Sequence, residues 1–117
     1  MKILITTDNH IVMNRERSEA VESEIDGAIE RFEGHLTRLE VHLADENADK
    51  GGDREIKCVI DAHIDGMKTV TVTEYAGTID SAITGATEEM KRLLESTFSK
   101  LDEKRTRKER SADRLVD

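Results

Sequence analysis

The stretch IKCVIDAHIDGMKTVTVT, residues 56–73, contains two expected strands and the turn that joins them. From Ile56 to Ile64 every second side chain is apolar, which is the pattern of a strand with one buried face. Asp65-Gly66 is a strong signal for a hairpin turn, and residues 69–73 are rich in β-branched side chains. The stretch therefore predicts a β-hairpin.

Two further strands and one helix are expected before the hairpin. Leu39, Val41 and Leu43 alternate with polar residues, and a loop at 45–53 without an apolar pattern follows them. Residues 2–7 have the composition of a first strand. Between these two strands, apolar residues occur at helical spacing: Val21, Ile25, Ala28, Ile29 and Phe32. Asn14 or Ser18 would cap the helix at its start, and Gly34 stands where a left-handed helix end favours glycine.

A second helix is expected after the hairpin, beginning near Thr78. Its apolar face is formed by nine residues: Ile79, Ala82, Ile83, Ala86, Met90, Leu93, Leu94, Thr97 and Leu101. Gly85 lies inside this helix, where glycine is unfavourable, so we expect a close approach to the sheet at this position. The periodicity stops after Leu101. We therefore expect one domain at residues 1–103 and a charged, flexible tail at 104–117.

The expected order of elements is β-α-β-β-β-α. Because each strand has one apolar face and each helix one apolar stripe, the simplest packing places both helices on one face of a four-stranded sheet. The fold class is therefore α+β. The chain of 117 residues is long enough for one such domain.

Composition limits the class of protein. Cys58 is the one cysteine, so neither an internal disulfide nor a cysteine zinc site can form. The apolar run at the start of the chain is too short for a secretion signal, and no stretch is long and apolar enough to cross a membrane. We therefore expect a cytoplasmic protein. Its net charge of −8 opposes indiscriminate binding to nucleic acid.

The charge is unevenly distributed, however. Residues 91–110 carry +4, which leaves −12 on the rest of the chain. We predict contacts with RNA phosphates from four residues of the second helix and four of the tail: Lys91, Arg92, Lys100, Lys104, Arg105, Arg107, Lys108 and Arg110. The alternative for both groups is a solvated surface that improves solubility.

The first helix is acidic on its outward face. Glu19, Glu22, Asp26, Glu30 and Glu33 share that face at 100° per residue. Glu22, Asp26 and Glu30 are candidates for docking a basic protein partner, although a solvated face is the favoured interpretation.

No catalytic site is expected. His42, Asp61 and His63 would lie on the exposed face of the sheet, where surface residues are favoured over a metal site. Cys58 alternates with the buried residues, and Asp80 stands in the first turn of a helix, where the helix dipole favours a carboxylate. No glycine-rich phosphate loop is present. We expect no enzyme, no cofactor, no metal and no small-molecule substrate.

Several segments resemble the ribosome hibernation promoting factor family, also called the ribosome-associated inhibitor A or sigma-54 modulation protein family. The segments that carry the resemblance are LEVHLADEN at 39–47, KGG at 50–52, TIDSAI at 78–83 and KRLLE at 91–95. They correspond to a short member of the family. The resemblance implies a fold like that of a double-stranded RNA-binding domain. It also implies binding to the small ribosomal subunit, through 16S rRNA and ribosomal proteins, and inhibition of translation under stress or in stationary phase.

The sequence departs from the family pattern at three places. The first helix is acidic where the family is usually basic, Asp8 stands where many members have Arg or Lys, and Tyr75 is displaced by one residue. An alternative function follows from the first departure. The chain would then be a protein-interaction module of the same fold that uses its acidic helix and has little affinity for RNA.

Overall fold

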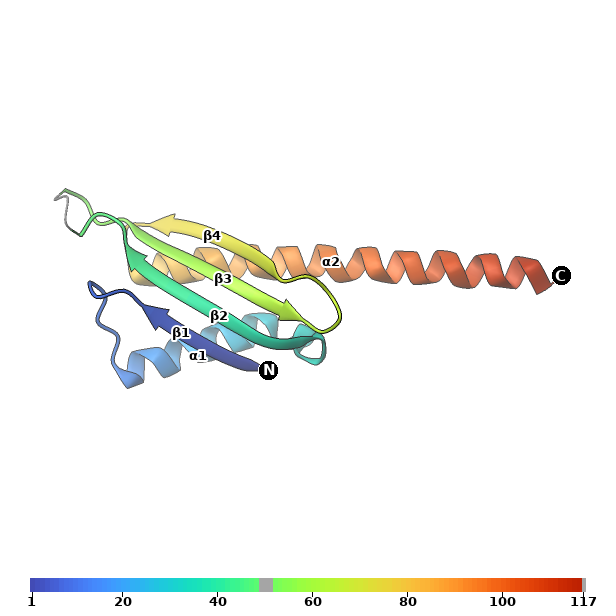
Figure 1. The fold of residues 1–117 in the computed structure, drawn as a ribbon, viewed down its shortest axis with the longest axis horizontal. Coiled ribbons are helices and arrows are strands. Elements are labelled where there is room, and N and C mark those ends of the chain that lie inside the picture. The colour runs from blue at the N-terminus through green and yellow to red at the C-terminus, as the bar shows by residue number, and fades with distance from the viewer. Residues whose placement is uncertain (49–51, 117) are drawn as a thin grey trace.

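The computed structural model describes the backbone of residues 1–48 and 52–116, and the side chains of residues 1–48 and 52–100. Its elements are β1 (Lys2–Thr7), α1 (Arg15–Ile29), the 3-10 helix η1 (Glu30–His35), β2 (Leu36–Asp45), β3 (Ile56–Ile64), β4 (Val70–Ala76) and α2 (Ile79–Val116), as Figure 1 shows. This order confirms the predicted β-α-β-β-β-α arrangement and the α+β class. The predicted likeness to a double-stranded RNA-binding domain stays a prediction.

The strands form one sheet in the order β1-β2-β3-β4. β1 is parallel to β2, so the chain must cross over between them, and α1 lies in that crossover. The two other pairs are antiparallel. At the predicted hairpin turn, Gly66 has a φ of 74° and the Met67 N–H donates to the Ile64 carbonyl at 3.2 Å. This geometry explains why glycine is favoured there.

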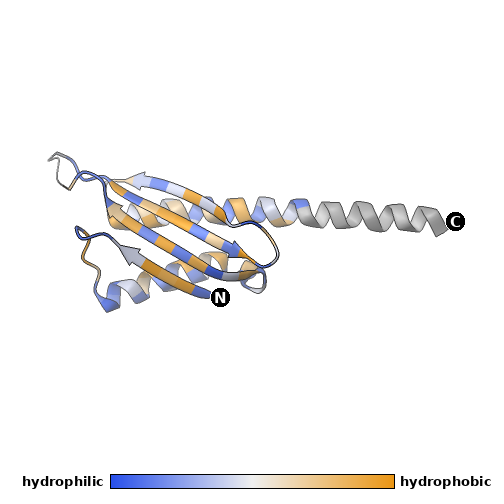
Figure 2. Ribbon diagram, viewed as in Figure 1, coloured by the Kyte–Doolittle hydropathy of each residue, from blue (hydrophilic) through white to orange (hydrophobic). Residues whose placement is uncertain are grey.

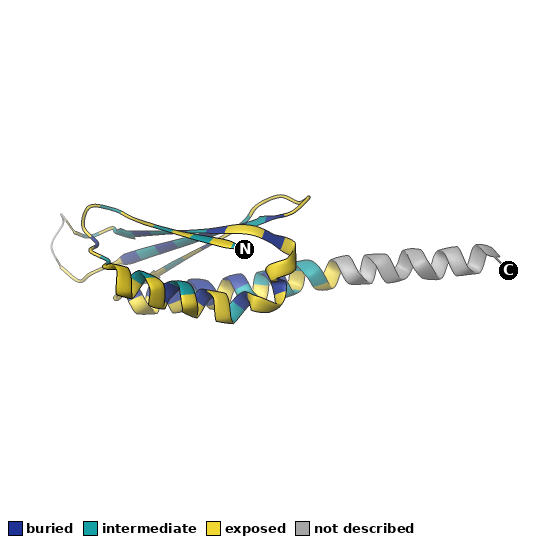
Figure 3. Ribbon diagram, turned by 90° about the horizontal axis from the view of Figure 1, so that it is seen from below, coloured by how far each residue is buried: buried dark blue, intermediate teal, exposed yellow. Residues whose placement is uncertain are grey.

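The hydrophobic core lies between the sheet and the two helices. Along β2 and β3 apolar and hydrophilic residues alternate (Figure 2), and α1 and α2 both cover the same face of the sheet (Figure 3). The predicted core residues are buried: Val21, Ile25, Phe32, Leu39, Val41, Ile56, Ile60, Met90 and Leu94. Leu101 lies outside the residues whose side chains are described.

The start signals of both helices are confirmed, and one end signal is wrong. The Asn14 side chain accepts from the Arg17 N–H at 2.8 Å, and Thr78 Oγ1 accepts from the Ser81 N–H at 3.1 Å. Gly34 does not adopt a left-handed conformation. The α-helix tightens instead into η1, and the chain enters β2 directly at Leu36. The hydrogen bonds of a 3-10 turn satisfy the last carbonyl groups of the α-helix, which a glycine in the left-handed conformation would otherwise allow the following N–H groups to reach.

The α2 helix is longer than its apolar face. Its backbone is helical to Val116, although the apolar periodicity stops after Leu101. In Figure 1 it continues well beyond the sheet. The flexibility of 104–117 and the domain limit at 103 stay predictions. Within the described part of the chain, no helix has the length and apolar character that crossing a membrane requires.

Candidate nucleic-acid interface

The two helices form one continuous surface on the side away from the sheet. The helices lie side by side and run in the same direction. Three polar contacts show this, because they follow one another in the same order along α1 and η1 as along α2. These contacts are Arg17–Asp80 at 3.2 Å, Glu24–Thr84 at 2.9 Å and Arg31–Glu95 at 2.5 Å. A ligand on this side of the molecule would therefore contact both helices at once.

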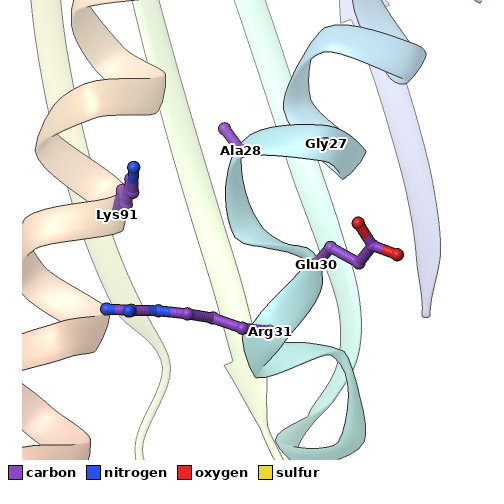
Figure 4. A pocket seen from close by; sticks show the side chains of 5 residues that line it. All are labelled: Gly27, Ala28, Glu30, Arg31 and Lys91. Atoms are coloured by element: carbon purple, nitrogen blue, oxygen red, sulfur yellow. The ribbon is translucent and has the colours of Figure 1, made fainter.

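An open cavity of about 360 Å³ lies between the helices near their middle. It is lined by Gly27, Ala28, Glu30, Arg31 and Lys91. In Figure 4, Arg31 extends from η1 towards α2, whereas Glu30 points away from α2. Because Gly27 has no side chain, nothing narrows the cavity at that position. The groove therefore brings two cationic side chains, Arg31 and Lys91, to one place.

Lys91 is the predicted RNA-contact residue that the structure places in this groove. It is half-buried, and within the part of the chain with described side chains no carboxylate forms an ion pair with it. Its ammonium group is therefore available to an anion. Arg31 is already paired with Glu95, so an incoming phosphate would have to share or replace that contact.

The other predicted basic residues do not join Lys91 in one stripe. Arg92 and Lys100 are exposed on α2, and Lys100 stands about half a turn around the helix from Lys91. Lys104 lies on the helical backbone beyond the described side chains, as does the predicted tail cluster of Arg105, Arg107, Lys108 and Arg110. The described cations thus form a groove site and a separate exposed face.

The predicted acidic docking residues lie beside the same groove. Asp26 and Glu30 are exposed and Glu22 is half-buried. Among described residues, none of the three has an ion-pair partner. Glu30 lines the cavity together with Lys91, so the acidic and basic candidate sites meet there.

The sequence analysis missed Arg31, because it considered only the acidic residues on the outward face of the first helix. The sequence feature that could have identified Arg31 is its position directly before Phe32, a predicted core residue. In the structure Phe32 is buried, and the Arg31 guanidinium lies 4.7 Å from the centre of its ring. That position fixes the stem of the side chain near the core and leaves its charged end over the groove.

Cys58 and Asp80 lie where the sequence predicts them, in the core and in the first turn of α2. Cys58 is fully buried, and burial together with the charge of Glu74 raises the pKa of its thiol to about 12. It is therefore protonated at neutral pH and unreactive. Asp80 is exposed in the first turn of α2 and pairs with Arg17.

Comparisons with known proteins bear on the fold and the family of this chain. The model of the family described as sigma 54 modulation protein / S30EA ribosomal protein matches residues 5–102. Comparison with curated proteins gives no match.

Two solved structures share the fold. A ribosomal subunit interface protein from Coxiella burnetii superposes with a TM-score of 0.70 at 9% identity, over 85% of this chain and 99% of that chain. The N-terminal domain of Protein Y from Thermus thermophilus gives a TM-score of 0.61 at 17% identity, over 82% of this chain and 94% of that chain. At such identities the likeness shows the fold alone. The family match, in contrast, spans most of the chain, and the chain therefore belongs to the sigma 54 modulation protein / S30EA ribosomal protein family.

Proposed function

We propose that the protein is a ribosome-associated inhibitor of translation that binds the small ribosomal subunit in the cytoplasm, under stress or in stationary phase. Membership of the family is the observation that carries this proposal. It is supported by the shared fold with a protein named for the interface of the ribosomal subunits. The protein acts by occupying a site and needs neither catalysis nor a cofactor.

The groove between α1 and α2 and the exposed cations of α2 form the RNA-binding surface of this proposal. Lys91 binds a phosphate of 16S rRNA within the groove, while Arg92 and Lys100 contact further phosphates outside it. Lys104 and the tail cluster of Arg105, Arg107, Lys108 and Arg110 extend the same contacts. Such contacts position a protein on RNA without reading its sequence, which suits a factor that recognises one fixed shape.

The acidic face of α1 sets the strength of this binding. Bringing Asp26 and Glu30 close to a polyanion is unfavourable, and the repulsion depends on the concentration of salt. We therefore expect binding to be weaker than for a family member with a basic first helix. Because fewer phosphates are neutralised and salt screens the repulsion, we also expect the affinity to depend less steeply on salt.

A second candidate function is a protein-interaction module. It is favoured by one observation, that Glu22, Asp26 and Glu30 have no ion-pair partner within the described chain. In this case a basic protein would bind the acidic face, and the cations of α2 would be dispensable.

Co-sedimentation with purified small subunits distinguishes the two candidates. We expect the wild-type chain to pellet with small subunits at low salt, and the variant E22K/D26K/E30K to pellet more strongly because a repulsive face becomes attractive. If the wild type stays in the supernatant at low salt, the proposal of an inhibitor is overturned. If the wild type pellets and the acidic-face variant does not, the interaction module is supported instead.

A further inference from the structure

The two cations of the groove between α1 and α2 are not equally free to bind an anion. Arg31 lines the groove from η1, and its Nη2 forms an ion pair with Glu95 Oε1 of α2 at 2.5 Å. Lys91 lines the same groove from α2, and it forms no ion pair with any residue whose side chain is described. Glu30 also lines the groove but points away from α2 (Figure 4). Arg31 is thus already bound to a carboxylate of its own chain, whereas Lys91 is not.

The local sequence explains why Glu95 turns to Arg31 and not to Lys91. Lys91 and Glu95 are four residues apart on α2, so their side chains are neighbours on the helix surface. The order in which Lys precedes Glu is the less favourable one, because the helix dipole favours the acidic residue nearer the N-terminus. The guanidinium of Arg31 lies 4.7 Å from the centre of the Phe32 ring, which keeps it at the groove. Glu95 therefore pairs across the two elements and leaves Lys91 available.

The Arg31–Glu95 ion pair is also weak enough to be exchanged. The two side chains are 61% and 38% exposed. At such exposure an ion pair contributes little, because water and salt screen it and two long side chains must be ordered. A phosphate in the groove would contact both Arg31 and Lys91, and arginine binds phosphate through two parallel hydrogen bonds. The pair can therefore form in the free protein and still give way to RNA.

We propose that Glu95 is an intramolecular competitor of RNA. In the free protein it occupies the guanidinium of Arg31. An RNA phosphate that enters the groove displaces Glu95 and binds Arg31 and Lys91 together. This inference rests on the proposed RNA-binding surface and adds a control of its affinity. A small anion that contacts only one of the two cations does not displace Glu95, so the groove favours a phosphate that the rest of the surface already positions.

Removing the charge of Glu95 tests the competition. E95Q keeps the shape of the side chain and should tighten binding to an RNA duplex of about 20 base pairs by about 3–10-fold, measured by fluorescence anisotropy at low salt. E19Q is the matched control. Glu19 pairs with Arg15 at 3.2 Å and lies outside the groove lining, so E19Q makes the same change of charge and also releases an arginine. It should tighten binding by less than about twofold.

The effect of E95Q must depend on Arg31 if the two anions compete for it. In an R31Q background, E95Q should tighten binding no more than E19Q does, because no guanidinium is released and only one negative charge is removed. An equal effect of E95Q with and without Arg31 would mean that Glu95 acts by repulsion alone, and the competition would be overturned. Thermal unfolding of each variant shows whether it still folds. If E95Q lowers the Tm and binds RNA no more tightly, the ion pair only holds η1 to α2, which overturns the proposal as well.

Co-sedimentation of the same variants with purified small subunits separates this inference from the proposed function. If the wild type binds the RNA duplex and E95Q acts through Arg31, but the wild type does not pellet with small subunits, the inhibitor proposal is overturned and the competition stands. If the wild type pellets and E95Q binds no more tightly than E19Q, the competition is overturned and the inhibitor proposal stands. A wild type that binds neither partner overturns both.

Discussion

Leu94 in α2 is fully buried, at 0% exposure, whereas its neighbour Leu93 is only half-buried at the edge of the same core. Both residues are leucines of the same helix, so they differ only in how deeply their side chains are buried. They therefore allow the position of α2 on the sheet to be tested one side chain at a time.

Replacing Leu94 with Ala should lower the free energy of unfolding by about 2–5 kcal/mol, because apolar burial is reduced and a cavity is left behind. Urea denaturation measures the change. L93A is the control and should be destabilised clearly less. Equal effects in the two variants would mean that α2 is rotated from the position described.

Asp8 is one of the departures from the family pattern, and the structure gives it a local role. Its Oδ2 accepts from the Asp45 N–H at 2.9 Å, and its Oδ1 accepts from the His10 N–H at 3.0 Å. Partial burial raises the pKa of this carboxyl, but the backbone N–H donors and the nearby His10 outweigh burial and hold the pKa below its usual value. The carboxylate thus ties the end of β1 to the end of β2.

A lowered pKa makes this contribution dependent on pH. The stabilisation is complete above the pKa of an unfolded Asp, about 3.9, and is lost as the pH falls through the lower folded value. D8N should therefore be less stable than the wild type at neutral pH, and the difference should shrink as the medium becomes acidic. Urea denaturation at several pH values checks this. D65N, which changes an exposed Asp in the hairpin turn, is the control for the loss of one carboxylate and should alter the stability at neutral pH much less than D8N, since Asn-Gly suits the turn equally well. A pH-independent difference for D8N would contradict the role assigned to its charge.

At the scale of elements, α2 approaches β4 closely at one glycine. A Cβ on Gly85 would lie 2.8 Å from Cγ of Glu74, which is closer than real Cβ contacts. Glu74 lies on the strand face that is turned to the helices, next in register to Cys58. The predicted close approach at Gly85 is thereby confirmed, and the side chain that requires it is identified.

G85A should therefore destabilise the protein by about 1–3 kcal/mol, in spite of the better helix propensity of Ala. In an E74A background the obstacle is absent, so the same change should become neutral or stabilising. Gly27 in α1 is the matched control because a Cβ there meets nothing, and G27A should stabilise by up to about 1 kcal/mol. Chemical denaturation of the five proteins completes the cycle. If G85A is destabilising to the same extent with and without Glu74, the close approach to Glu74 is not the cause.

At the scale of the whole molecule, the two faces of the protein have different chemistry. The helix side carries the groove with Lys91 and the exposed cations of α2, together with the acidic residues of α1. The sheet side carries the Glu40, His42, Asp61 and His63 cluster. The proposed ribosome binding uses only the helix side, so equal changes of charge on the two sides should have unequal effects.

The variant K91E/R92E/K100E should nearly abolish binding to small subunits. The slope of log affinity against log salt should fall by about 0.7–0.9 for each RNA phosphate that the variant no longer neutralises. K2E/K57E/K68E makes the same change of net charge away from the helices and should reduce binding much less. Co-sedimentation at several salt concentrations measures both. Equal reductions would show that net charge alone governs binding, with no defined RNA-binding surface on the helices.

The sequence by itself determined the features that depend on neighbouring residues. Period-two alternation from Ile56 to Ile64 defines a strand because successive side chains of a strand point to opposite faces. Asn14 and Thr78 cap their helices because the donors that they accept from lie three residues away. The element order and the family follow from such local patterns.

Only the tertiary structure decided the features that depend on pairing across the chain. Glu40 faces Asp61 because of the register of β2 with β3. Arg31 faces α2 because η1 lies alongside that helix. Gly34 was assigned the wrong conformation because the following strand, and not the glycine, sets how α1 ends. Contacts between residues that are distant in sequence are settled by packing, which no local pattern contains. The groove proposed for RNA binding is made of such contacts.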